Sequence, residues 1–230
     1  MDNDELIDRV RALRAQGRSP KQIARAVGVS PAVVTPLVRA LATEDQPGLD
    51  DVVGCWISPG WSTGLTVADH PEWPEADLSE DGPEGLVNVL IARQDRRSRI
   101  RVTGYLVDVY CLGVKDVLDP RVLDTHALVE FTRAYFSAYS APPLAAPVEL
   151  ACHLVFGAVA YARGLGFEPA AGFETAKDQL GPWTGPSAIG FGREGKPFYI
   201  QGPHDNAAAI IKTLERSVGP GNYHFLLVSM

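Results

Sequence analysis

Residues 86–114, LVNVLIARQDRRSRIRVTGYLVDVYCLGV, decide the fold of the larger part of this chain. Two runs rich in Val, Leu, Ile and Tyr, 86–93 and 100–114, are separated by the charged segment QDRRSR. Strand-forming runs joined by a short polar segment are typical of a β-hairpin. We therefore predict two antiparallel strands here.

The sequence around this hairpin predicts helices and further strands in no regular alternation. We expect helices over 124–140, 147–165 and 206–218, a second hairpin over 189–202, and a closing strand over 223–228. Because βαβ alternation is absent, the pattern predicts a mixed, largely antiparallel α+β domain over 52–230 and not a doubly wound parallel sheet.

Length and composition are those of a globular protein. The chain has 230 residues, 46% of them hydrophobic, and three cysteines without CxxC spacing. No apolar run approaches the ~18 residues of a membrane span, and the acidic start MDNDELID does not resemble a signal peptide. We therefore expect a cytoplasmic protein that does not enter a membrane.

The net charge of −7 is unevenly distributed. Residues 1–45 carry seven Lys or Arg and six Asp or Glu, whereas residues 46–230 carry 14 and 22. A locally basic segment on an acidic body can bind a polyanion, although a solvated helix face would have the same composition.

The basic segment contains two repeated helix-start signals in residues 19–41, SPKQIARAVGVSPAVVTPLVRAL. Ser19 and Ser30 are each followed by proline, as in an N-cap and first helical residue, and Gly28 supplies a tight turn between them. This segment resembles the helix-turn-helix of bacterial regulators, resolvases and sigma factors. With a preceding helix over 5–15, the resemblance implies a small all-helical helix-turn-helix domain over 1–43, followed by a linker over 44–51.

The resemblance implies nucleic-acid binding through Lys21, Arg25, Ser30, Thr35 and Arg39. The lysine and arginines would contact phosphates, and Ser30 and Thr35 would face the groove. None of the outward positions of the second helix of the motif carries a side chain that makes bidentate base contacts, and Pro36 is expected to kink that helix. DNA or RNA binding, with a possible homodimer, and protein docking therefore both remain open.

The segment Gly190–Pro197, GFGREGKP, matches GxGxxG and nearly matches a phosphate-binding loop. Such a loop must lead into a helix, but Pro197 stands where Ser or Thr binds Mg²⁺ and a strand-like FYI follows. We interpret the glycines as a β-turn. The sequence predicts no cofactor and no metal.

The candidate catalytic residues are Asp108, Lys115, Asp116 and His153. Asp108 lies between apolar residues in a predicted strand, and Lys115 and Asp116 follow the end of that strand. His153 shares a helix face with Glu149, so one interpretation is an acid/base or metal site formed by Asp108, Cys111, Glu149 and His153. The favoured interpretation is structural: the buried aspartate bonds to backbone groups, the histidine is hydrogen-bonded, and the thiols have no chemical role.

Trp56, Trp61 and Trp73 are expected either to line a pocket or to cap the core. Three patterns, VDxYCLGVK, HxxxGAxxYAxxLGF and FGxxGKPFYIxGP, resemble an uncharacterised family of bacterial, actinobacterial-type proteins. The resemblance implies a recurring domain but no activity, cofactor or catalytic residue.

Three functions remain open from the sequence. The first is a transcriptional regulator whose α+β domain senses a ligand or mediates oligomerisation. The second is a hydrolase-like or nucleic-acid-processing enzyme, and the third is a protein-docking module.

Overall fold

The chain forms two compact units, 1–48 and 49–230, and each is described on its own. This computed structural model describes residues 3–15, 18–31, 33–35, 37, 51–68, 70, 72–74, 83–95 and 99–227. The division falls within the predicted linker 44–51, of which only Asp51 is described.

In the first unit, helices α1 (Asn3–Ala15) and α2 (Pro20–Val27) pack around one apolar core. The backbone is helical again at positions 31, 33–35 and 37. The core is built from all three segments: Leu6, Val10, Ile23, Ala24 and Val34 are buried, and Leu13, Val27 and Leu37 pack against them. These are the apolar positions that the sequence predicts to be inside.

The predicted start and end of α2 are confirmed. The Ser19 hydroxyl accepts the backbone N–H of Gln22 at 3.4 Å, and the Gln22 side chain accepts the backbone N–H of Ser19 at 2.9 Å. This reciprocal capping box satisfies N–H groups that a helix start otherwise leaves free. Gly28 ends the helix with φ 73°, a left-handed conformation that favours glycine.

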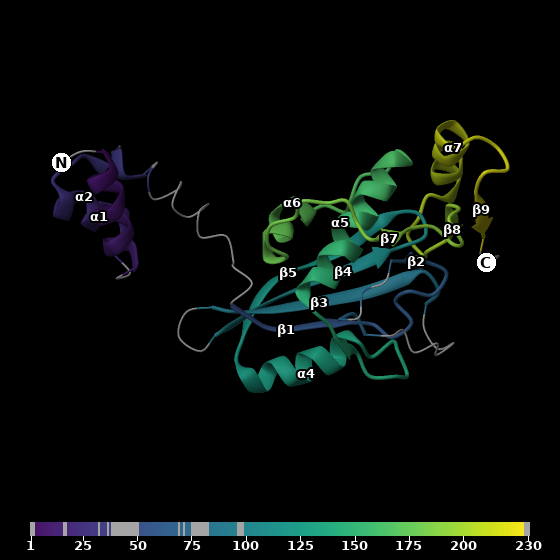
Figure 1. Cartoon of the computed structure of the whole chain (residues 1–230), viewed down its shortest axis with the longest axis horizontal. Coiled ribbons are helices and arrows are strands. Elements are labelled where there is room, and N and C mark those ends of the chain that lie inside the picture. Colours follow the sequence, from purple (N-terminus) through teal and green to yellow (C-terminus); the bar gives the residue numbers. More distant parts are fainter. Residues whose placement is uncertain are drawn as a thin grey trace. The chain divides into compact units, whose positions relative to one another are not determined.

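The second unit is built on a five-stranded antiparallel sheet, which confirms its α+β class (Figure 1). Its strand order is β5-β4-β3-β1-β6. The strands are β1 (Val52–Ile57), β3 (Leu86–Gln94), β4 (Ile100–Asp108), β5 (Gly113–Leu123) and β6 (Leu144–Ala145). β3 and β4 form the predicted hairpin.

Helices cover both faces of this sheet, so alternate strand residues enter two different cores. α4 (Thr125–Tyr135) packs on one face with Leu90, Val102 and Leu128. α5 (Val148–Gly164) packs on the other with Val89, Tyr105 and Leu154 (Figure 1).

The remaining elements are β2 (Thr66–Val67), α6 (Phe173–Ala176), the 3₁₀ helix η2 (Lys177–Gln179), β7 (Ile189–Gly190), β8 (Phe198–Ile200), α7 (Ala207–Ser217) and β9 (His224–Leu226).

Two predictions about strands are wrong. The run 100–114 is not one strand, because it turns at 109–112 and continues as β5, an edge strand that the sequence analysis missed. The second hairpin over 189–202 does not form either. β7 pairs with β2 and β8 pairs in parallel with β9, so only the short turn between Arg193 and Lys196 remains of it.

The three tryptophans do not form one cluster. Trp61 and Trp73 lie edge to face, 6.1 Å between ring centroids, in the core beside α5. Trp56 packs with the α4 core instead. No helix in the described part of the chain combines the length and the hydropathy of a membrane span.

Candidate functional site

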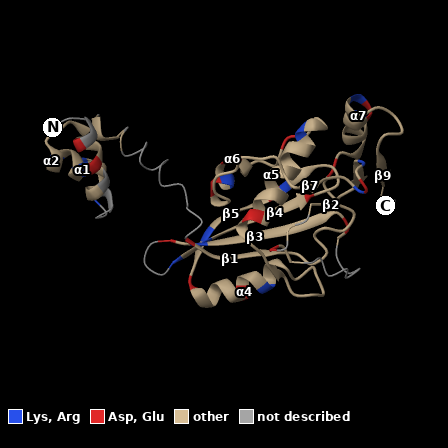
Figure 2. Ribbon diagram, in the orientation of Figure 1, with Lys and Arg blue, Asp and Glu red and all other residues tan. Residues whose placement is uncertain are grey.

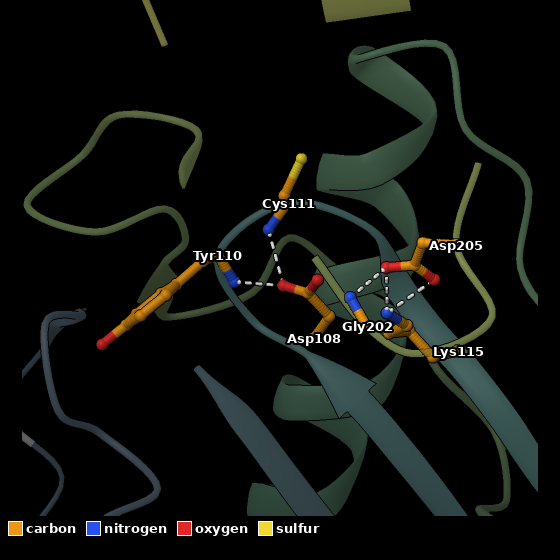
Figure 3. Close-up of polar contacts among 6 residues, drawn as sticks. All are labelled: Asp108, Tyr110, Cys111, Lys115, Gly202 and Asp205. Carbon is orange, nitrogen blue, oxygen red and sulfur yellow. Dashed lines mark hydrogen bonds and ion pairs between the residues drawn. The ribbon is translucent and has the colours of Figure 1, made fainter. Parts of the chain in front are cut away.

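The turn between β4 and β5 is organised by the buried carboxylate of Asp108. Asp108 ends β4 and is 5% exposed. Its Oδ1 accepts the backbone N–H of Tyr110 at 3.0 Å and that of Cys111 at 2.8 Å (Figure 3). Gly113 completes the turn with φ 70°. Asp108 therefore satisfies two buried donors that a four-residue turn leaves without strand partners.

Burial dominates the electrostatics of this carboxylate. Desolvation raises the pKa of Asp108 to about 6, although the two N–H donors and the positive charge of Lys115 oppose the shift. The ionised form is thus retained near neutral pH by donors fixed in the backbone.

Lys115 is brought close to this turn, but its direct partner is Asp205. Its ammonium lies 3.0 and 2.8 Å from the two carboxylate oxygens of Asp205, which also accept the N–H of Gly202 at 2.8 Å (Figure 3). Burial favours the protonated acid, but the bonds from Lys115 and Gly202 outweigh it and lower the pKa of Asp205. This ion pair joins β5 to the loop before α7.

Asp116, the neighbouring candidate, does not join these groups. β5 has a bulge at Lys115, and Asp116 lies beside Leu106 and Tyr135 instead of beside Asp205. It is exposed, and its Oδ1 accepts the N–H of Val117 at 2.8 Å.

His153 lies in an aromatic cluster formed by Trp73, Trp183 and His70. Its ring centroid is 5.0 Å from that of Trp73, 4.8 Å from that of Trp183 and 5.8 Å from that of His70. His70 also stacks on Trp73 at 4.0 Å. Sequence analysis missed His70 and Trp183, although the HxxW spacing of His70 and Trp73 was a readable signal.

The hydrogen bonds of His153 fix its tautomer. Nδ1 accepts the backbone N–H of Ala188 at 2.8 Å, so the proton of the neutral ring is on Nε2, 3.9 Å from Glu149. Burial lowers the pKa of His153, the charge of Glu149 opposes this, and His70 adds to it. The nearby Ser187 hydroxyl donates to the carbonyl of His153 at 3.0 Å and accepts the N–H of Ile189, so it is held as a structural group.

Asp108 and His153 therefore have different partners within the described residues and do not form a joint acid/base pair. The three cysteines are buried and free. Burial raises the pKa of Cys55 to about 12, and burial followed by the charge of Asp108 raises the pKa of Cys111. Thiols that resist deprotonation are poor nucleophiles and poor metal ligands. The described residues also hold no group of three or more potential His, Cys, Asp or Glu metal ligands.

The candidate nucleic-acid-binding residues differ in availability. Lys21, Arg25 and Ser30 are exposed. The hydroxyl of Thr35 donates to the carbonyl of Pro31 at 2.7 Å, so its proton is used within its own helix. Arg39, with Pro36, lies outside the described residues.

Comparisons with protein-family models, with curated proteins and with solved structures gave no match to this chain. The resemblances drawn from its motifs therefore stay predictions.

Proposed function

We propose that this chain is a nucleic-acid-binding protein, a transcriptional regulator that uses residues 1–43 as a helix-turn-helix. The observation that carries the proposal is the arrangement around α2. The helix begins at the Ser19 capping box, ends at left-handed Gly28, and packs on one core with α1 and with Val34 and Leu37 of the following segment. This order of capped helix, tight turn and second helix is the one that regulators use.

The charge on α2 supports a polyanionic partner. Lys21 and Arg25 are four residues apart, hence on one face, and both are exposed. No Asp or Glu occurs between residues 9 and 43, so no carboxylate of this segment competes for them. Lysine and arginine at such positions contact phosphates.

The remaining candidate residues favour modest sequence preference. Ser30 is exposed, whereas the Thr35 hydroxyl is bonded within its helix, so of these two described candidates only Ser30 has a hydroxyl available to read base edges. Affinity would come from phosphate contacts and would depend strongly on salt. A homodimer would double the number of such contacts, and the α+β domain would sense a ligand or mediate oligomerisation.

The test is enrichment of sheared genomic DNA and total RNA on the purified full chain at near-physiological salt, followed by sequencing. The variant Lys21→Ala/Arg25→Ala should bind nucleic acid more weakly than the wild type. Lys212→Ala/Arg216→Ala is the matched control, because it removes the same two residue types at the same spacing from exposed positions of α7. The basic residues of this helix are blue in Figure 2.

Salt dependence sharpens the experiment. If Lys21 and Arg25 each contact one phosphate, the slope of log K against log salt should be shallower by about 2 in the first variant and unchanged in the control. Equal loss in both variants, or no enrichment of either nucleic acid by the wild type, would overturn the proposal.

Protein docking is a second candidate, favoured by one observation. Val33, on the helix that would enter the groove, is 46% exposed. Under this alternative, Val33→Ser should abolish capture of a protein partner, while Lys21→Ala/Arg25→Ala should leave it intact. The contacts of Asp108 and His153 are those of structural groups and do not favour the enzyme alternative.

A further inference from the structure

A cavity of about 260 Å³ opens between the β1–β2 loop and the start of β3. Its inner part is formed by the buried side chains of Trp61, Val87, Val109 and Tyr139, and Thr63 and Glu84 are exposed at its rim. An apolar cavity of about 150 Å³ already accommodates benzene. The space therefore suits a molecule of one or two rings.

Tyr110 contacts both sides of the cavity. The backbone of Tyr110 is held by Asp108, and its hydroxyl donates to the carbonyl of Thr63 at 2.8 Å. Its ring packs on Gly85, where a Cβ would come within 2.4 Å of it. Gly85 in turn accepts the N–H of Val109 at 2.9 Å, which ties the rim to the β4–β5 turn. A preformed cavity costs less ordering on binding than one that must open.

Two polar side chains that line the cavity already use their donors within the chain. The indole N–H of Trp61 is used by the carbonyl of Pro74 at 3.2 Å, and the Tyr139 hydroxyl donates to the carbonyl of Leu86 at 3.2 Å. At the rim, the carboxylate of Glu84 lies 2.9 Å from Arg193 in a half-exposed pair that leaves one oxygen for another donor. The occupant should thus be apolar at one end and carry hydrogen-bond donors at the other.

We propose that this cavity is a binding site for a small aromatic amine, with its ring against Trp61 and Val109 and its ammonium group at Glu84. The role of this cavity as an effector site for a regulator rests on the proposed function. Its role as a binding site does not rest on that function, because the experiment below contains no nucleic acid and can fail or succeed independently of the enrichment experiment.

The probes are tryptamine and indole, which share the ring and differ in the amine. Each is titrated into the ¹⁵N-labelled full chain at millimolar concentration and followed by heteronuclear NMR. Tryptamine should shift the amides of Gly60, Trp61, Gly85 and Val109, and it should bind about fivefold more tightly than indole because of the additional ion pair.

Two variants and one control decide the outcome. Thr63→Phe adds a ring at the exposed rim and should weaken both probes at least about tenfold, whereas Val129→Phe, the same added ring on exposed α4, should not. Glu84→Gln should remove the advantage of tryptamine over indole. Absence of binding, shifts that map elsewhere, or equal affinity of Thr63→Phe and the wild type would overturn the site. Equal binding of the two probes would overturn the amine assignment.

Discussion

The phenolic hydroxyl of Tyr110 donates a hydrogen bond to the backbone carbonyl of Thr63, 2.8 Å away, and so links the β4–β5 turn to a loop 47 residues earlier. The N–H of the same residue is bound by Asp108. Tyr110 thus connects the turn that Asp108 caps to the Thr63 loop at the rim of the cavity.

Tyr110→Phe removes this link and keeps the ring. We expect a loss of about 1 kcal/mol in unfolding free energy, the usual net value of one hydrogen bond, and weaker tryptamine binding because the Thr63 loop loses an anchor. Denaturant unfolding and the NMR titration measure the two effects. Unchanged affinity with lowered stability would limit the role of Tyr110 to the fold.

Gly104 is required by the position of Tyr135. A Cβ at Gly104 would lie 2.6 Å from the hydroxyl of Tyr135, which bonds the carbonyl of Tyr105 at 3.2 Å. Gly104→Ala should therefore cost about 1–3 kcal/mol of unfolding free energy through overpacking. In a Tyr135→Ala background the same substitution should cost no unfolding free energy, because the clash is gone. A double-mutant cycle measures this difference. Additive costs would contradict this explanation.

Asp108 should give the second unit a characteristic pH dependence. Its pKa is about 6 in the folded chain against an ordinary 3.8, so the folded state holds this proton more firmly than the unfolded state. Its contribution to stability is therefore greatest below the ordinary pKa and falls as pH rises toward 6, by about 3 kcal/mol in total.

Asp108→Asn isolates this contribution. The amide oxygen can still accept the N–H groups of Tyr110 and Cys111, but the side chain no longer titrates. Urea unfolding between about pH 4 and 7 should show a smaller decline for this variant than for the wild type, with exposed Asp116→Asn as the control. If the stability of Asp108→Asn declined with pH in parallel with that of the wild type, the predicted contribution of Asp108 would be contradicted. Asp108→Ala, which leaves both donors unsatisfied, should be less stable than Asp108→Asn at neutral pH.

Local patterns in the sequence were sufficient for the elements whose determinants are close together in the chain. Ser19 and Gly28 delimit α2, and the two runs around QDRRSR form the β3–β4 hairpin as predicted. Each of these depends on residues within one turn or one strand pair, so periodicity and capping rules apply directly.

The elements that were missed depend on distant partners. Gly195 suggested a hairpin, yet β8 pairs with β9 across a helix and β7 pairs with β2 from the other end of the domain. Lys115 and Asp205 are 90 residues apart, and no local pattern in either segment predicts their ion pair. The turn after Asp108 had a readable signal in Gly113, but the alternation of apolar residues through Cys111 concealed it.

His153 should exist as the Nε2–H tautomer and resist protonation. Its Nδ1 accepts the N–H of Ala188, so a proton there would break this bond inside the aromatic cluster, and burial lowers its pKa below the ordinary 6.5. Because the folded chain binds this proton less well than the unfolded chain, its contribution to stability is complete above pH 6.5 and is lost as pH falls through the window below that value. Long-range ¹H–¹⁵N spectra identify the tautomer, and a titration of the ring signals gives the pKa. A proton on Nδ1, or a midpoint at or above pH 6.5, would contradict this assignment of the His153 ring.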